Sequence, residues 1–430
     1  MRKLSKKQNL IILVALFTVV VIIALIVGAN VIKTNITNSS YNSANNNSSS
    51  SNLLPEYIKE GITIGGITGT LIDLDTSDAT ANAEDIIWGE TAYVKGEKIT
   101  GTKVVTVAHG KASQKTFEEN TTLIDDYGNR VKVPVGFKIA EDSATSVTGG
   151  VVIEDVTAGD NNTKGSQFVW VPVGDVLTDN NGSKTTITLG RYTFAEDGTE
   201  TLVQSAENYE DESQLKTSSS GYYQELLKTT TSKNTKAKDI ESFITKSLSS
   251  GGYYIGRYEA GDATATNSAR TSSTSDTNPI VSKAGVYPYT YITQPQASSL
   301  CQRMYSNSYF ESDLINSYAW DTATVFIQKF SEDKDYSRQG GKNTKAALQK
   351  CGASILNEVD SGDKVQDVRC NIYDMAGNSE EWSTETYSDS DSPWVSRGGW
   401  YNTSNYTSTR SIYNTTNSGK DISCRTTLYL

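Results

Sequence analysis

An uncharged apolar run near the start of the chain constrains its fold more than any other feature. Leu10 to Gly28 is 19 residues long and contains no charged side chain. At about 1.5 Å per residue, a helix of this length covers roughly the hydrocarbon thickness of a bilayer. The apolar part of a cleaved secretion signal is usually about 7–15 residues, and only a poor cleavage site follows this run. We therefore expect an uncleaved transmembrane signal anchor over residues 9–30.

The charges around this helix predict its orientation. The residues before it carry Arg2, Lys3, Lys6 and Lys7 and no acid. By the positive-inside rule, residues 1–8 form a cytoplasmic tail and the remaining chain lies outside the cell. The formal net charge of −11 argues against a nucleic-acid partner, because phosphate binding needs clustered Lys and Arg. The expected location is a bacterial cell membrane, with one membrane crossing and an extracellular C-terminal domain.

Two low-complexity regions follow the predicted anchor. Residues 31–52 are rich in Ser and Asn, cannot bury apolar surface and should form a flexible stalk. Residues 53–110 contain a Gly/Thr repeat, in which Gly61–Thr70 and Gly89–Thr102 share a Gly-x-Thr start and an Ile-Thr-Gly-Thr end. Alternating β-branched residues between glycines predict short hairpins. The repeat resembles those of phage tail and bacterial surface proteins, which implies a spacer.

The rest of the chain mixes predicted strands and helices. Alternating apolar patterns predict strands over 129–142, 149–155, 166–174 and 253–261, with Pro134 and Pro172 at strand ends. Residues 178–238 are polar and poorly patterned, so long loops are expected there. Helical spacing of apolar residues predicts helices over 238–250, 294–305 and 319–330, the first ended by Gly251 and Gly252.

Four blocks in this region carry a resemblance to a known family. They are GGYYIGRYEAG (251–261), AWDTATVFI (319–327), NIYDMAGNSEEW (371–382) and SRGGWY (396–401). With the C-terminal CRTTLYL, they resemble the formylglycine-generating-enzyme, or sulfatase-modifying-factor, family. The resemblance covers residues 115–430 and implies a C-type-lectin-like fold. The closing GFR of the family is reduced here to Cys424-Arg425, a departure from the pattern.

The catalytic ligands of this family are missing from the sequence. Its sulfatase-activating members bind copper with a cysteine pair shortly after the RGG block, where this chain has only Cys424, at the far end of the interval. The iron-dependent sulfoxide synthases of the same fold need a histidine cluster. This chain has one histidine, His109, which lies outside the domain and is expected to be a surface residue. We therefore expect a domain that is not an enzyme.

The resemblance also implies a structural Ca²⁺ at the turn within NIYDMAGNSEEW. Position by position, Asp374 and Glu381 would supply side-chain oxygens, and Gly377 and Ser379 would supply backbone carbonyls. Oxygen ligands on a tight glycine turn suit Ca²⁺. The alternatives are a plain turn with solvated acids, or an acid/base pair of Glu380 and Glu381. The pair is disfavoured because adjacent strand residues face opposite sides.

The expected ligand-binding surface lies just after the RGG block. Of the 19 residues from Trp400 to Ser418, 16 are Tyr, Asn, Thr or Ser. Tyrosine supplies rigid contact area and the small polar residues supply adaptable hydrogen bonds, as in antibody loops. The segment resembles the variable regions that diversity-generating retroelements mutate, which would place diversification within 397–425. The residues expected to face or support the ligand are Trp394, Trp400, Tyr401, Asn402, Asn405, Tyr406, Arg410, Tyr413 and Asn414.

Cysteine usage leaves two alternatives open. The four cysteines, Cys301, Cys351, Cys370 and Cys424, form no C-x-x-C motif. An even count outside the cytoplasm permits two disulfides, with three connectivities. Four buried free thiols are the alternative.

These patterns predict an α+β protein with a C-type-lectin-like domain after a membrane helix, a stalk and small β modules. The predicted function is surface display of this domain, as an adhesin or receptor, for an extracellular protein or glycan ligand. The rival functions are a divergent formylglycine-generating enzyme that uses Cys424 with another cysteine, and a structural cell-surface or phage-tail component.

Overall fold

The computed structural model describes residues 54–71, 76–86, 91–103, 105–159, 162–209, 215–216, 221–225, 238, 240–273, 278–340, 346–357, 364–388, 391–403 and 405–430. The predicted cytoplasmic tail, membrane helix 9–30 and stalk 31–52 lie outside these residues. Within them, no helix combines the length and apolar character that a bilayer crossing requires. The chain divides into two compact units, Met1–Thr80 with Tyr93–Lys98, and Ala81–Ala92 with Ile99–Leu430.

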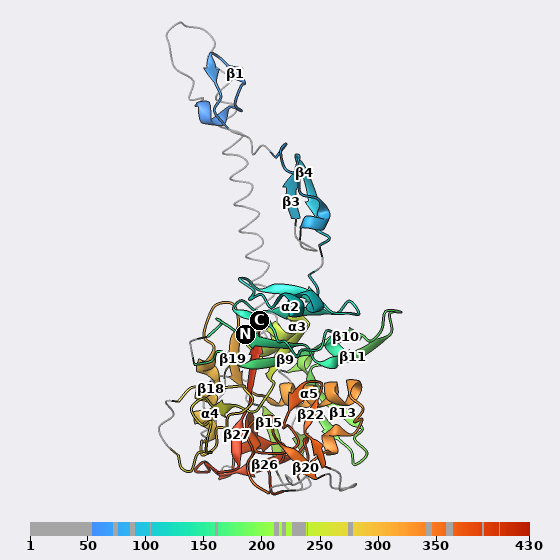
Figure 1. The fold of residues 1–430 in the computed structure, drawn as a ribbon, viewed down its shortest axis with the longest axis vertical. Helices are drawn as coiled ribbons and strands as arrows, with labels where there is room; N and C mark the ends of the chain where they lie inside the picture. Colours follow the sequence, from blue (N-terminus) through green and yellow to red (C-terminus); the bar gives the residue numbers. More distant parts are fainter. Residues whose placement is uncertain are drawn as a thin grey trace, which may run out of the picture. The chain divides into compact units, whose positions relative to one another are not determined.

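The Gly/Thr repeat forms two short hairpins, as its pattern predicts (Figure 1). In the first, β1 (Thr63–Ile64) pairs with β2 (Ile67–Thr68) after the 3₁₀ turn η1 (Pro55–Tyr57). In the second, β3 (Thr91–Val94) pairs with β4 (Glu97–Thr100), and η2 (Ala83–Asp85) precedes it. Both two-residue turns have positive φ at each position, with 58° and 84° at Gly65 and Gly66. Such turns match the twist of the paired strands.

A six-stranded antiparallel sheet forms the centre of the larger unit. Its order is β19 (Glu311–Leu314), β28 (Thr426–Tyr429), β16 (Gly252–Gly256), β9 (Gln167–Pro172), β8 (Val152–Asp155) and β7 (Phe137–Ile139). The side chains of β9 and β16 alternate between two core clusters, with Trp170 and Tyr254 in one and Val171 and Tyr253 in the other. Because both faces are covered, the run FVWVP in β9 is apolar throughout rather than alternating.

The helices cover the two faces of this sheet. Residues of α3 (Ile240–Ser250) and α5 (Ser317–Phe330) belong to one core cluster, and residues of α2 (Val107–Ser113) and α4 (Gln294–Met304) belong to the other. The three longer helices lie where the apolar spacing predicted them, and α3 ends at Gly251, whose φ is 73°. Helix α5 differs from a half-exposed amphipathic helix, since all of its residues from Ser317 to Gln328 are buried. The exposed His109 lies on α2, as expected of a surface residue.

A second sheet carries the C-terminal blocks. Its order is β14 (Leu215–Lys216), β15 (Tyr222–Glu225), β24 (Glu380–Tyr387), β25 (Trp394–Arg397) and β26 (Arg410–Tyr413), and β27 (Ile422–Cys424) pairs in parallel with β24. All eight residues of β24 are buried. This strand therefore runs through the middle of the unit with structure on both faces, although half of its residues are polar or charged.

The remaining strands form hairpins, and one prediction was wrong. Residues 178–238 contain strands rather than only long loops. The hairpins pair β5 (Thr121–Ile124) with β6 (Arg130–Val133), β10 (Gly174–Leu177) with β11 (Lys184–Ile187), β12 (Gly190–Phe194) with β13 (Glu200–Ser205), β17 (Gly261–Asp262) with β18 (Ile280–Val281), β20 (Ile355–Asn357) with β21 (Lys364–Gln366), and β22 (Val368–Arg369) with β23 (Ile372–Tyr373). Further 3₁₀ turns are η3 (Val147–Gly149), η4 (Ala206–Asn208) and η5 (Tyr336–Arg338).

Candidate functional site

The Tyr- and Asn-rich segment leaves strand β25 through the RGG block. Gly398 has φ 78°, in the left-handed region that favours glycine. A Cβ atom on Gly398 would lie 2.7 Å from the carbonyl oxygen of Met375. A Cβ atom on Gly399 would lie 2.8 Å from the carbonyl oxygen of Ala376. The two glycines thus let the segment run directly against the NIYDMAGNSEEW turn, which links the two sequence blocks in space.

Helix α5 and the chain after it hold the middle of the segment. The Trp320 indole Nε1 of α5 donates a hydrogen bond of 2.9 Å to the carbonyl oxygen of Thr407. The backbone N–H of Thr407 donates to the carbonyl oxygen of Gln339 at 2.9 Å. The Arg338 guanidinium lies 4.1 Å from the ring centroid of Tyr406. These contacts fix the backbone of the segment even where it has no regular secondary structure.

The Glu380 carboxylate forms the inner anchor of the segment. Glu380 is 1% exposed, and its oxygens accept hydrogen bonds from four neutral donors. Ser396 and Tyr413 donate their hydroxyls to Oε2 at 2.6 Å and 2.8 Å. Ser411 Oγ and Asn405 Nδ2 donate to Oε1 at 3.1 Å and 3.2 Å. Burial raises the pKa of Glu380, although these hydrogen bonds stabilise its charged form.

A second anchor is a fully buried ion-pair network. Arg410 Nη2 lies 2.7 Å from Asp321 Oδ2, and Arg410 Nε lies 2.9 Å from Glu385 Oε2. Arg397 pairs with the same two carboxylates, and Arg191 Nη2 lies 2.7 Å from Glu385 Oε1. Burial alone would raise the pKa of Glu385, but the three guanidinium groups outweigh it and hold that pKa below its ordinary value. The network therefore keeps both carboxylates charged beneath the segment.

The structure divides the predicted ligand-binding residues into two groups. Those whose side chains bind inward are Trp394, Asn405, Arg410 and Tyr413. Trp394 is 2% exposed and its ring packs 5.6 Å from that of Trp382, so it supports the surface from below. Those at the surface are the exposed Asn402 and Asn414 and the partly exposed Trp400, Tyr401 and Tyr406. The inward-bound Arg410 and Tyr413 act as scaffold, which the sequence alone did not indicate.

The predicted Ca²⁺ turn lies over a group of buried carboxylates. Glu259 accepts hydrogen bonds from Asn378 Nδ2 at 2.7 Å and from the Ser379 N–H at 2.9 Å. Asn378 has φ 67°, and its side-chain bond to Glu259 explains why asparagine occupies this left-handed position. Asp374 Oδ2 accepts from the Gly352 N–H at 2.6 Å, whereas its buried Oδ1 has no hydrogen-bond partner.

Arg425 neutralises part of this group. Its Nε lies 2.8 Å from Glu381 Oε2, and its Nη2 donates to Glu381 Oε1. Burial raises the pKa values of the four carboxylates, Glu259, Asp367, Asp374 and Glu381. Four acids around one arginine favour either protonation of some of them or a bound cation.

The four predicted Ca²⁺ ligands meet this demand only in part. Both Glu381 oxygens bind Arg425, and the Gly377 carbonyl already accepts a hydrogen bond of 3.0 Å from the Ser379 N–H. Asp374 Oδ1 is the ligand atom that remains unpartnered. Across the described part of the chain, no three His, Cys, Asp or Glu side chains converge as a metal site. Glu380 and Glu381 bind different partners, as their adjacent positions on one strand predict.

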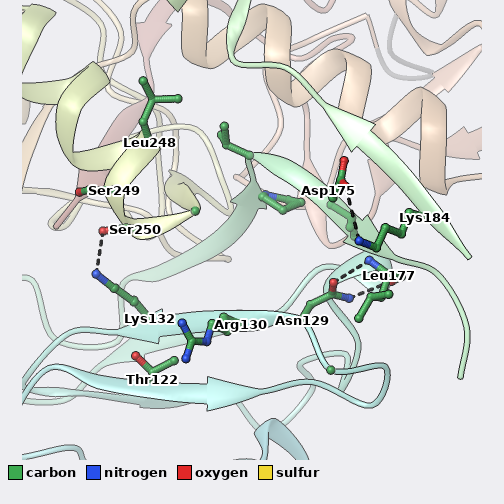
Figure 2. Close-up of a pocket in the computed structure, with 15 residues that line it drawn as sticks. Thr122, Asn129, Arg130, Lys132, Asp175, Leu177, Lys184, Leu248, Ser249 and Ser250 are labelled. Carbon is green, nitrogen blue, oxygen red and sulfur yellow. Dashed lines mark hydrogen bonds and ion pairs between the residues drawn. The ribbon is translucent and has the colours of Figure 1, made fainter. Parts of the chain in front are cut away.

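A concave pocket of about 420 Å³ lies elsewhere on the larger unit (Figure 2). Arg130, Lys132 and Lys184 line it, together with Asp175 and the end of α3. Lys132 Nζ donates a hydrogen bond of 3.3 Å to Ser250 Oγ, and Lys184 Nζ lies 3.6 Å from Asp175. Lys132 thus lies at the C-terminal end of α3, where a cation is favourable. No predicted site residue lines this pocket.

Sequence reasoning missed the groups that organise the surface. Glu380 entered it only as half of an acid/base pair, and Asp321 and Glu385 did not enter it at all. A buried carboxylate on a strand has no periodic signature of its own. The available signal was the density of hydroxyl and amide donors after the RGG block, since a buried acceptor such as Glu380 needs several donors.

Comparisons with known proteins give weak matches. No protein-family profile matches the chain, and no curated protein matches it. Among solved structures, the chain is similar to Treponema denticola variable protein 1, with 9% identity and a TM-score of 0.30 over 61% of this chain and 96% of the other. It is also similar to the crystal structure of CarF, with 14% identity and a TM-score of 0.28 over 42% of this chain and 87% of the other. Both similarities are too low to carry an argument about function.

Proposed function

We propose that the chain is a membrane-anchored bacterial surface protein that binds an extracellular protein or glycan through the segment Trp400–Ser418. In this proposal the larger unit is a C-type-lectin-like domain of the sulfatase-modifying-factor type, and it binds without catalysis. The observation that carries the proposal is the two-layered construction of the segment. Its inner side chains bind buried charges, while Trp400, Tyr401, Asn402 and Asn414 remain available at the surface.

This construction suits recognition rather than simple loop closure. An ordinary connection between two strands needs no buried anchors such as Glu380, which is 1% exposed and accepts four hydrogen bonds. A pre-ordered backbone loses little conformational entropy when a ligand binds. Tyrosine and tryptophan at the surface then supply rigid contact area, and asparagine supplies adaptable hydrogen bonds.

A binding screen tests this proposal. The full chain in detergent is applied to a glycan array and to an array of extracellular proteins, and positive spots are re-measured with a Tyr401→Ala/Asn402→Ala/Asn414→Ala variant. Loss of such surface contacts should weaken binding by about tenfold or more. The matched control is Tyr309→Ala, because Tyr309 is 59% exposed and lies outside the segment.

Two results would contradict the proposal. Binding that the triple variant retains would place the ligand elsewhere. Arrays without any signal, together with an altered cell envelope on gene deletion, would favour the structural rival. Membrane anchoring is tested separately, by fractionation and by protease treatment of intact cells, which should digest the C-terminal domain and spare the tail 1–8.

Diversification of residues 397–425 belongs to the proposal and has its own test. A reverse-transcriptase gene and a near-copy of this segment should lie beside the coding sequence. Because Gly398, Gly399 and Arg410 are held by the backbone and by buried charges, variation should avoid them and concentrate at Tyr401, Asn402 and Asn414. Variation that is frequent at the buried positions would contradict this assignment.

The enzymatic rival has one supporting observation. Cys301 Sγ and Cys424 Sγ lie 3.9 Å apart, so Cys424 does have a second cysteine beside it. Both residues are 0% exposed, which leaves a peptide substrate no access to them. Mass spectrometry of a sulfatase-type cysteine peptide after incubation with the protein and copper would detect an aldehyde product and thereby decide for the enzyme.

A structural Ca²⁺ at Asp374, Gly377, Ser379 and Glu381 is also part of the proposal. The buried, unpartnered Oδ1 of Asp374 and the excess of buried carboxylates support it. The Arg425–Glu381 pair opposes it. If the ion binds, its charge replaces protons on the acids and stabilises the turn that the Tyr- and Asn-rich segment contacts.

A further inference from the structure

The first hairpin module, which we define as Leu54–Leu71, exposes an unusual amount of apolar surface. Eleven large hydrophobic side chains are exposed in the described part of the chain, and five of them lie in these 18 residues. They are Leu54, Tyr57, Ile62, Ile64 and Leu71, which are 45–68% exposed. Only Ile58 and Gly69 are buried in the module. The larger unit covers its own apolar residues, so this exposure is specific to the module.

The two faces of the hairpin differ in chemistry. Successive strand residues face opposite sides, so Ile64 and its cross-strand partner Ile67 lie on one face. Thr63 and Thr68 lie on the other, where their hydroxyl oxygens are 3.1 Å apart. The threonines satisfy each other, whereas Ile64 is 52% exposed. The hairpin thus has a polar face that needs no partner and an apolar face that lacks one.

Such a module gains little stability from its own contacts. Each strand is two residues long, and both strands are edges of a two-stranded sheet. An isolated two-stranded hairpin is marginal in water, and unpaired edges readily accept another strand. Covering the apolar face would provide the missing burial.

Charge favours another copy of the same chain as the cover. Residues 61–71 contain no Asp, Glu, Lys or Arg, although the whole chain has a net charge of −11. When identical surfaces meet about a symmetry axis, like residues come together, and any charge among them would repel. This charge-free stretch is therefore a place where two copies can approach closely. Copies anchored in one membrane, as proposed above, would also present the module at the same height and in the same orientation.

We propose that Leu54–Leu71 is a self-association module, through which two or more copies of the chain pack their isoleucine faces together. The assembly would display several copies of the Trp400–Ser418 surface at once. Linked binding sites raise the effective affinity for a repetitive surface by about 10²–10⁴ without new contacts. The inference rests on the surface of the module itself and does not depend on the identity of the ligand.

Cysteine cross-linking tests the contact directly. In the full chain in membranes, Ile64→Cys is treated with a short bismaleimide, which joins two nearby thiols, and the products are separated on a denaturing gel. We expect a cross-linked band at twice the monomer mass of 46.7 kDa. Thr63→Cys is the matched control, because it is the adjacent residue on the opposite face and should cross-link far less. Equal cross-linking at both positions, or at neither, would overturn the proposal.

A second measurement identifies which surface drives assembly. Light scattering of the full chain in detergent should give a multiple of the monomer mass, and Ile62→Ser/Ile64→Ser should reduce it to the monomer. The module contains no tryptophan, so thermal unfolding followed by tryptophan fluorescence reports on the larger unit and should not change. A wild-type monomer, or an oligomer that the double variant leaves intact, would refute self-association through this face. Neither outcome would affect the ligand-binding proposal.

Discussion

Replacing Tyr413 with phenylalanine should destabilise the larger unit although it removes a single oxygen. The Tyr413 hydroxyl donates a 2.8 Å hydrogen bond to the buried Glu380 carboxylate. Phenylalanine keeps the ring, whose centroid lies 5.4 Å from that of Trp382, so the aromatic packing is preserved. A hydrogen bond to a charged group contributes about 1.5–3 kcal/mol. We expect Tyr413→Phe to lower the free energy of unfolding by about this amount.

The effect should depend on pH with a defined sign. Burial raises the pKa of Glu380 above its ordinary value of 4.5 in the folded state. A carboxyl with a raised folded pKa contributes stability that is present below 4.5 and is lost as pH rises through the folded value. Removing a donor raises that folded pKa further. The deficit of Tyr413→Phe should therefore be smallest in acid and should grow toward neutral pH.

Urea unfolding followed by tryptophan fluorescence, at a series of pH values, measures both quantities. Tyr401→Phe is the matched control, since it makes the same chemical change at a partly exposed residue of the same segment. It should change the free energy of unfolding by no more than about 0.5 kcal/mol. Equal effects of the two substitutions, or a Tyr413→Phe deficit that does not change with pH, would refute the role of Glu380 as the inner anchor.

Three further predictions concern other buried groups. Arg410→Met should cost about 3–5 kcal/mol in thermal unfolding because it uncovers buried carboxylates, and Arg338→Met, which loses only a contact with an aromatic ring, should cost about 1 kcal/mol. If Ca²⁺ binds, EDTA should lower the melting temperature of the wild type but not of Asp374→Asn; if it does not, Asp374→Asn should raise the melting temperature at neutral pH, because burial raises the pKa of Asp374. Refolding in oxidised glutathione should join Cys301 to Cys424, whose sulfurs are 3.9 Å apart, and leave two titratable thiols; four remaining thiols would contradict this.

Local sequence signals predicted many secondary-structure elements correctly. The Gly65-Gly66 and Lys95-Gly96 turns, the strands around Pro134 and Pro172, and the helix stop at Gly251 each depend on nearby residues. Turn conformation and apolar period act over a few positions, so they can be read without the fold. The hairpin β12–β13 was missed because its polar strands carry little apolar alternation. Its position is set by distant contacts, including that of the Tyr192 N–H with Asp321 on α5 at 2.9 Å.

The sequence by itself determined the composition of the candidate surface and its position after the RGG block. It could not determine which of those side chains face outward. Arg410 and Tyr413 are as polar as Asn402 and Asn414, and all four lie within 13 consecutive residues. Only the tertiary structure brings Glu380 and the buried carboxylates of β24 and α5 beneath this segment. A buried charge requires partners, so the nearest donors turn inward and the others remain at the surface.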